Sequence, residues 1–133
     1  MIIDDDDSIR ESLDMYLTEE GYDVEVADRG WVGISKYAAS RAEIVILDIR
    51  LPDVSGFFVY DELRKQDHQA KVIMITAFHD ENAIEGAIQK GVYKYIKKPI
   101  DMNALDRAIL EVLQQSSAKQ GRICVRNVYT GID

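Results

Sequence analysis

Residues 44–48 read IVILD, a continuous run of β-prone apolar side chains that ends abruptly in Asp48. Such a run is typical of a strand that is buried on both faces of a sheet. The loop that follows contains Pro52 and Gly56, which favour a turn, and a helical pattern begins at about Phe57. A buried strand that leads through a short loop into a helix is the repeating unit of a parallel α/β sheet.

The same alternation of apolar runs and helical patterns extends to about residue 115. The predicted strands lie at 2–3, 24–26, 44–47, 72–75 and 93–97. The first predicted helix begins at about residue 8, and the next three cover 31–39, 57–65 and 81–90. The last predicted helix buries Met102, Leu105, Ile109 and Val112. Successive β-α units predict an α/β fold: a doubly wound, five-stranded parallel sheet with helices on both faces.

The patterns also predict the order of the strands. Strands three and four are continuously apolar, as expected for central strands, whereas strands two and five alternate, as expected for edges. These features match the flavodoxin-like order 2-1-3-4-5. The first strand is short for a central position, so we expect the natural chain to start a few residues earlier.

Two local signals concern the chain ends and helix caps. Ser8 and Glu11 have capping-box spacing, with Asp7 as a competing N-cap, and Gly21 should end the first helix. Residues 114–121 are polar and small, like a linker. We therefore expect one domain over 1–115, followed over 116–133 by a linker or the start of a truncated output region.

Composition narrows the class of protein. The chain has 133 residues, the size of one domain, and its net charge of -8 argues against direct nucleic-acid binding by this domain. No run is apolar enough to suggest membrane insertion or a signal peptide. The single cysteine, Cys124, cannot form an internal disulfide, which favours a reducing, cytoplasmic location.

Polar side chains follow four of the predicted strands, at the edge where ligands bind in open α/β sheets. They are Asp4 and Asp5 after strand one, Asp48 after strand three, Thr76 after strand four and Lys98 after strand five. Each residue alone has an ordinary structural explanation as a cap, a strand end or a surface charge. Their joint position predicts a site.

Three converging carboxylates repel one another unless a cation lies among them. Mg²⁺ prefers oxygen ligands and retains sites for water and phosphate oxygens, and Mn²⁺ is expected to substitute for it. Lys98 would supply a second positive charge and Thr76 a hydroxyl donor, while a carboxylate can act as the nucleophile that forms an acyl phosphate. The pattern therefore predicts Mg²⁺-dependent phosphoryl transfer.

Four motifs together resemble the receiver domain of response regulators, from about Ile2 to Gln115. They are IIDDDDSIRESL (2–13), IVILDIRLPDVSGF (44–57), VIMITAF (72–78) and YKYIKKPI (93–100). The resemblance implies that Asp48 is the phosphoacceptor and a metal ligand. It further implies that Asp5 is a direct Mg²⁺ ligand and that Asp4 acts largely through water.

The resemblance assigns roles to further residues. The backbone carbonyl of Arg50 would complete the metal ligands, and Lys98 would pair with the acids before phosphorylation and with the phosphoryl group after it. Thr76 would move to meet the phosphoryl oxygen, with Tyr95 as the aromatic switch residue. The Lys98–Pro99 peptide bond would be cis.

A receiver domain implies a signalling switch that catalyses its own phosphorylation rather than an enzyme with external substrates. The partner would be a sensor histidine kinase. The surface of the fourth helix, fifth strand and fifth helix would change to control an output domain or partner protein, in transcription, with homodimer formation as one expected result. Residues 97–109, KKPIDMNALDRAI, resemble receivers fused to AAA+ activators that act with the alternative sigma factor.

Two other functions on related chemistry fit less well. A haloacid-dehalogenase-type phosphatase needs a second aspartate two residues after the nucleophile, where this chain has Arg50. A flavodoxin-like flavin protein needs a Ser/Thr/Gly-rich phosphate loop after the first strand. The four aspartates at 4–7 would instead repel a phosphate.

Overall fold

The computed structural model describes residues 1–77 and 81–120, with the side chains of 1–77 and 81–115. The strands are β1 (Ile2–Ile3), β2 (Val26–Ala27), β3 (Val45–Asp48), β4 (Val72–Thr76) and β5 (Lys94–Lys97). The helices are α1 (Asp7–Glu19), α2 (Gly30–Ser40), α3 (Gly56–Gln66), α4 (Glu81–Lys90) and α5 (Met102–Gln120). The sheet is parallel in the order β2-β1-β3-β4-β5, which confirms the predicted fold class and strand order.

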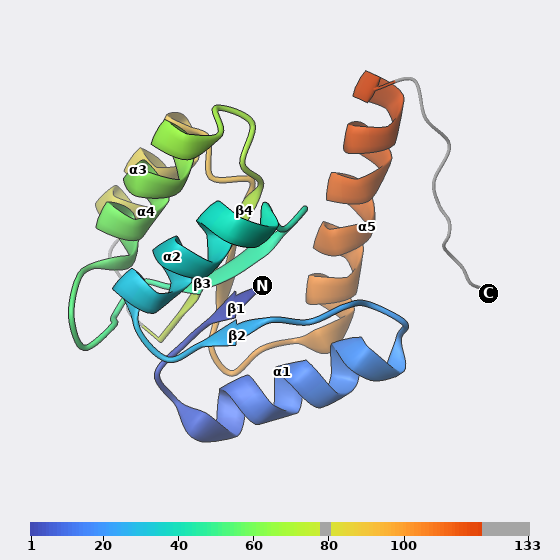
Figure 1. The fold of residues 1–133 in the computed structure, drawn as a ribbon, viewed down its shortest axis with the longest axis horizontal. Coiled ribbons are helices and arrows are strands. Elements are labelled where there is room, and N and C mark those ends of the chain that lie inside the picture. The colour runs from blue at the N-terminus through green and yellow to red at the C-terminus, as the bar shows by residue number, and fades with distance from the viewer. Residues whose placement is uncertain (78–80, 121–133) are drawn as a thin grey trace.

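The helices cover both faces of the sheet (Figure 1). On one face α2, α3 and α4 pack over a cluster that includes Tyr37, Leu63 and Met74. On the other, α1 and α5 pack over a cluster that includes Leu13, Ile73 and Leu105. Side chains alternate between these two cores along each central strand, which is why β3 and β4 are apolar at almost every position.

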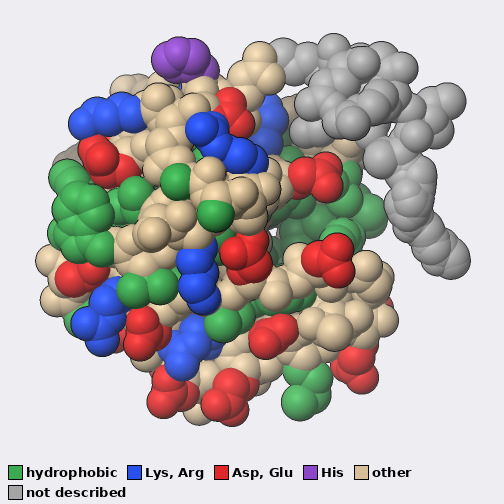
Figure 2. All heavy atoms as spheres, in the orientation of Figure 1, with side chains coloured by type: hydrophobic (Ala, Val, Ile, Leu, Met, Phe, Trp, Pro, Cys, Tyr) green, Lys and Arg blue, Asp and Glu red, His purple; other side chains and the backbone are tan. Residues whose placement is uncertain are grey.

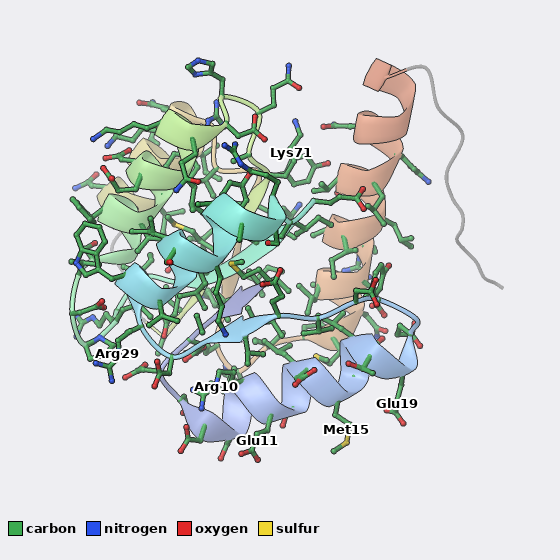
Figure 3. The ribbon with its side chains drawn as sticks, viewed as in Figure 1. Arg10, Glu11, Met15, Glu19, Arg29 and Lys71 are labelled. Atoms are coloured by element: carbon green, nitrogen blue, oxygen red, sulfur yellow. The ribbon has the colours of Figure 1, made fainter. Side chains whose placement is uncertain are left out.

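The predicted apolar faces of the first and last helices are present. Leu13 and Leu17 of α1 are buried, as are Leu105, Ile109 and Val112 of α5. The opposite face of α1 carries Glu11, Met15 and Glu19, which project away from the body of the protein in Figure 3. Figure 2 shows acidic side chains gathered along this edge of the molecule. Among the described residues, no helix is long and apolar enough to cross a membrane.

β1 is as short as the sequence predicts, yet it is central and fully buried. Ile2 pairs with Val26 on one side and with Ile46 on the other. The ladder extends by one bond beyond the strand, because the Ile46 N–H donates to the Met1 carbonyl at 2.8 Å. β2 covers Val26–Ala27, so the predicted strand at 24–26 starts two residues too early and misses Ala27.

The predicted N-cap of the first helix is wrong. The N-cap of α1 is Asp6, whose carboxylate accepts a bond from the Ile9 N–H at 3.2 Å; neither Ser8 nor Asp7 caps the helix. Several adjacent acids compete for one cap, and the spacing alone does not rank them. The polar segment after residue 113 is helical, since α5 continues to Gln120. Residues 121–133, with Cys124, lie outside the described residues.

α2 approaches the sheet so closely that a side chain at Gly33 has no room. A Cβ there would lie 2.4 Å from Cδ1 and 2.9 Å from Cγ1 of Ile3, which is fully buried. Helix propensity favours Gly33→Ala by about 1 kcal/mol, but overpacking a core costs about 1–3 kcal/mol. We expect the variant to be less stable than wild type by about 1 kcal/mol.

Shortening Ile3 to Val should relieve this clash. In a double-mutant cycle by urea unfolding, Gly33→Ala with Ile3→Val should be more stable than the sum of the single variants predicts, by at least about 0.5 kcal/mol. Strict additivity would show that Ile3 is not what restricts residue 33.

Candidate functional site

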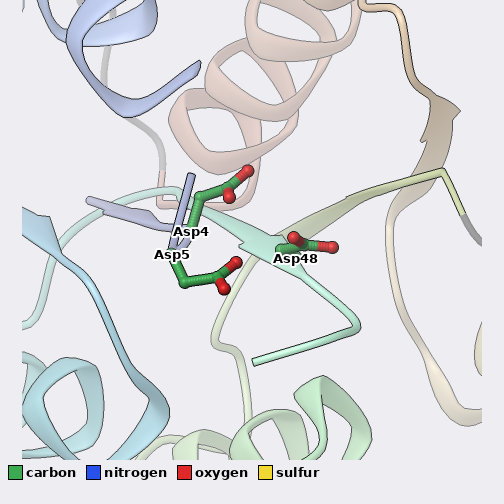
Figure 4. A group of neighbouring side chains, drawn as sticks. All are labelled: Asp4, Asp5 and Asp48. Carbon is green, nitrogen blue, oxygen red and sulfur yellow. The ribbon is translucent and has the colours of Figure 1, made fainter. Parts of the chain in front are cut away.

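Three carboxylates gather at the carboxyl ends of β1 and β3 (Figure 4). Oxygen atoms of Asp4, Asp5 and Asp48 all lie within 4.8 Å of one another. Asp4 is fully buried, Asp48 is only 4 % exposed, and Asp5 is open to solvent. They meet because β1 and β3 are neighbouring parallel strands with Ile3 opposite Leu47. The sequence predicted that these three side chains lie close together, and the structure confirms it.

Lys98 provides the positive charge at this cluster. Its Nζ lies 2.9 Å from Oδ2 of Asp4 and 3.0 Å from Oδ2 of Asp48. The backbone sets this position: Thr76 of β4 pairs with Lys97 of β5, and the Lys98 N–H donates to the Thr76 carbonyl at 2.9 Å. The peptide bond between Lys98 and Pro99 is cis.

Negative charge exceeds positive charge in the cluster. Burial raises the pKa of Asp4, and the charge of Asp48 raises it further, although the Asp6 N–H and Lys98 oppose both effects. Burial lowers the pKa of Lys98, but its bonds to the two aspartates outweigh this and leave the pKa raised. Lys98 is therefore firmly protonated, and one ammonium faces three carboxylates.

The loop between β3 and α3 forms the second wall of the site. Gly56 is required here, because a Cβ would lie 2.4 Å from the Asp48 carbonyl oxygen. The Gly56 N–H donates to the Ile49 carbonyl at 2.7 Å, and Arg50 and Ser55 form an antiparallel bridge. The Arg50 N–H lies 3.3 Å from Oδ1 of Asp48. The loop thus folds back on itself beside the Asp48 carboxylate.

An open hollow of about 330 Å³ lies over the cluster. It is lined by Asp5, Asp6, Asp48, Arg50, Thr76, Ala77 and Lys98. A hollow of this size, lined by carboxylates together with a lysine and a threonine, has room for a small anionic group with a cation.

The donor set suits Mg²⁺. Carboxylate oxygens are hard ligands, and the hollow leaves space for the water molecules that Mg²⁺ retains. Oδ2 of Asp4 is buried and has no hydrogen-bond donor aligned with it, although the Lys98 ammonium lies beside it. A nearby cation with its water would satisfy this oxygen and reduce the repulsion within the cluster.

Thr76 and Tyr95 lie on the neighbouring strands β4 and β5, where Tyr95 pairs with Met74, two residues before Thr76. Thr76 is 1 % exposed and ends β4, directly beside the hollow. Tyr95 is half-buried on the α2-α3-α4 face, and both burial and the charge of Asp48 raise the pKa of its hydroxyl.

The structure adds supporting residues that sequence reasoning missed. The Asp6 N–H donates to Oδ1 of Asp4 at 2.9 Å, and the Arg10 guanidinium donates to the Asp4 carbonyl at 2.9 Å. The Asp53 carboxylate caps α2 from the β3–α3 loop. The position of Arg10, one helical turn after the acids, could have suggested its contact with Asp4. The sequence carries no comparable sign for Asp53, because it caps a helix that precedes it in the chain.

Comparison with known proteins gives the family. Residues 1–110 match the model of the response regulator receiver domain. The chain belongs to this family. The receiver domain is also 31% identical over 117 residues to the chemotaxis protein CheY of Treponema pallidum, a match that covers 86% of this chain and 81% of that protein. Receiver domains bind Mg²⁺ at an acidic pocket, and this chain has an acidic cluster of Asp4, Asp5 and Asp48.

Two further similar proteins are a longer regulatory protein and a protein in a solved complex. The transcriptional regulatory protein AfsQ1 of Streptomyces coelicolor is 33% identical over 115 residues, which cover 86% of this chain but 51% of AfsQ1. The receiver domain therefore spans about half the length of that relative. The CheX-CheY-BeF3-Mg+2 complex from Borrelia burgdorferi matches with a TM-score of 0.79 and 29% identity, over 84% of this chain and 86% of that one.

Replacing Asp4 with Asn should stabilise the metal-free protein at neutral pH. The change removes one of the mutually repelling carboxylates, while the amide oxygen can still accept from the Asp6 N–H. Because the folded-state pKa of Asp4 is raised, its contribution to stability is complete below its usual pKa of about 4 and is lost as pH rises through the folded value. Urea unfolding in EDTA at a series of pH values should show this loss in wild type and not in the variant.

Asp23→Asn is the matched control, because Asp23 is exposed in the loop after α1. It should change stability by less than about 0.5 kcal/mol. Saturating Mg²⁺ should then stabilise wild type more than Asp4→Asn. An Asp4→Asn protein less stable than wild type in EDTA at pH 7 would contradict the repulsion between these acids.

Proposed function

We propose that this receiver domain accepts a phosphoryl group on Asp48 from a sensor histidine kinase. The observation that carries the proposal is the position of the Asp48 carboxylate. It lines the hollow, its oxygen lies within 4.8 Å of oxygens of Asp4 and Asp5, and the Lys98 ammonium lies 3.0 Å away. This arrangement combines a nucleophile with a lysine ammonium and with carboxylates that could hold a cation, which is what phosphoryl transfer needs.

The transfer assigns a task to each residue. An Asp48 oxygen attacks phosphorus of the phosphohistidine, so that a P–O bond forms, the P–N bond breaks, and the imidazole nitrogen keeps the electron pair and takes a proton from solvent. Lys98 exchanges its contact with the Asp48 oxygen for one with the phosphoryl group. The Thr76 hydroxyl, at the edge of the hollow, donates to a phosphoryl oxygen.

The metal would be held by Asp5, Asp48 and the Arg50 carbonyl, with Asp4 acting through water. Mg²⁺, or Mn²⁺ in its place, supplies positive charge opposite the phosphoryl oxygens when bound. The exposure of Asp5 and the burial of Asp4 support this division between direct and water-mediated roles. The related complex from Borrelia burgdorferi, whose name includes BeF3 and Mg+2, supports the choice of ion.

Phosphorylation would be read out through Thr76 and Tyr95. When the Thr76 hydroxyl moves toward the phosphoryl group, space opens beside β5, and the half-buried Tyr95 ring can turn inward. Packed elements tend to have discrete arrangements, so this small shift would alter the surface of α4, β5 and α5. Ile88, 46% exposed on α4, gives that surface an apolar contact, whereas Ala87 belongs to the core and Tyr93 packs on the opposite face of the sheet.

The output proposed is control of transcription through a linked output domain or a partner protein in the cytoplasm. The match covers only 51% of the transcriptional regulatory protein AfsQ1 and 26% of the transcriptional regulatory protein GlrR of Escherichia coli, so both relatives are much longer than this chain. The receiver domain would end near residue 115, with 116–133 leading toward the output region. Phosphorylation-dependent dimerisation through the α4-β5-α5 surface is part of the same proposal.

Asp48 should take up one phosphoryl group from acetyl phosphate, and only when Mg²⁺ is present. Intact-mass measurement should show a single added phosphoryl group on wild type and none on Asp48→Asn. Lys98→Ala should still bind Mg²⁺ but label at least about tenfold more slowly, since a positive charge at the transferring group is lost. Equal labelling of Asp48→Asn and wild type would rule out Asp48 as the acceptor.

The switch should be visible in hydrogen exchange over residues 76–98. Saturating beryllofluoride with Mg²⁺ should change exchange there in wild type, much less in Thr76→Ala and not at all in Asp48→Asn. Sedimentation of the same samples measures self-association. Unchanged exchange on saturated wild type would exclude the switch even if the protein dimerised.

A further inference from the structure

The N-terminus of α2 is capped by a residue from another loop. Its own N-cap residue, Arg29, makes no side-chain capping bond. Instead, Oδ1 of Asp53 accepts from the Gly30 N–H at 2.8 Å and Oδ2 accepts from the Trp31 N–H at 2.9 Å. Asp53 lies at the tip of the β3–α3 loop, 23 residues after Gly30. One carboxylate therefore joins the start of α2 to the loop that follows the phosphoacceptor.

Packing around Asp53 makes this junction tight. A Cβ on Gly30 would lie 2.4 Å from Cγ2 of Val54, so the loop rests directly on the helix backbone. Next to it, the rings of Trp31 and Phe58 meet edge to face, with centroids 5.3 Å apart and planes at 66°. The contact thus joins α2 to both the tip of the loop and the first turn of α3.

The carboxylate is suited to this role. Partial burial raises the pKa of Asp53, but the N–H groups of Trp31, Gly30 and Val54 outweigh that effect and leave the pKa lowered. Asp53 therefore stays ionised at neutral pH. Its negative charge also complements the positive end of the α2 dipole, so two effects hold the loop tip in place.

The same loop carries Arg50 at its other end. Arg50 is bridged to Ser55, and Gly56 is bonded to Ile49, so the loop is a short closed unit from Ile49 to Gly56. A closed unit that is anchored at its tip has little freedom to turn its first peptide groups. The Arg50 carbonyl belongs to one of those groups, and Arg50 is one of the residues that line the hollow.

We propose that Asp53 is a positioning residue for the metal site: by capping α2 it holds the β3–α3 loop so that the Arg50 carbonyl faces the acidic cluster. This inference rests on the proposed function, in which that carbonyl is a metal ligand. Asp53 does not touch the metal or the phosphoryl group. It acts through the backbone of the loop, as outer partners of metal ligands do.

The test is the affinity for Mn²⁺, measured directly from the electron paramagnetic resonance signal of the free ion. Asp53→Ala should raise the Kd for Mn²⁺ by about three- to tenfold, near the lower end of the effect that orienting partners have on metal affinity. Asp53→Asn should restore most of the wild-type affinity, because its amide oxygen can still accept from the Gly30 N–H although the charge is gone. This pair of variants separates the capping bond from the negative charge.

Asp67→Ala is the matched control at the far end of α3. It also removes one carboxylate and a backbone bond, since Oδ1 of Asp67 accepts from the Gln69 N–H at 2.9 Å. It should lower the urea midpoint as Asp53→Ala does, yet leave the Kd for Mn²⁺ at the wild-type value. Stability and metal affinity are thereby separated.

The outcomes discriminate clearly. Wild-type affinity in Asp53→Ala would overturn the proposal, as would equal weakening in Asp53→Ala and Asp53→Asn, which would assign the effect to charge alone. Weakening in Asp67→Ala as well would assign it to general loss of stability. Failure of the wild type itself to bind Mn²⁺ would instead refute the proposed function.

Discussion

The mutual repulsion of Asp4, Asp5 and Asp48 is the constraint on which the rest of the site depends. Three carboxylates within 4.8 Å, two of them buried, destabilise the folded chain unless positive charge is close. Lys98 supplies part of that charge, at 2.9 Å from Asp4 and 3.0 Å from Asp48. The remaining excess of negative charge favours a cation beside the cluster, which the proposed phosphoryl transfer requires.

The parallel sheet is what makes such a cluster possible. Carboxyl ends of neighbouring strands meet at one edge, so residues at or just after the ends of β1, β3, β4 and β5 converge without a continuous motif. This convergence constrains the backbone around these residues. Gly56 must lack a side chain beside the Asp48 carbonyl, and the β3–α3 loop is tied to α2 through Asp53. The helices thus hold the loops that shape the hollow.

Much of this could be predicted from the sequence, because periodicity reports burial directly. The continuous apolar runs before Asp48 and Thr76 identified the central strands. The acids after the first and third strands identified the site. Contacts that do not follow from the order of the strands could not be predicted. The capping of α2 by Asp53 depends on how a later loop folds over an earlier helix, and the choice of Asp6 as N-cap depends on local geometry among adjacent acids. The helical continuation to Gln120 was missed because its polar composition resembles a linker.

The central claim is that the acyl phosphate forms on Asp48 and on no other acid of the cluster. Borohydride reduces an acyl phosphate of aspartate to homoserine, which peptide mass spectrometry can locate. After treatment with acetyl phosphate and Mg²⁺, we predict homoserine at position 48 alone, with Asp4 and Asp5 intact. Homoserine at position 4 or 5, or its formation in the absence of Mg²⁺, would contradict the account.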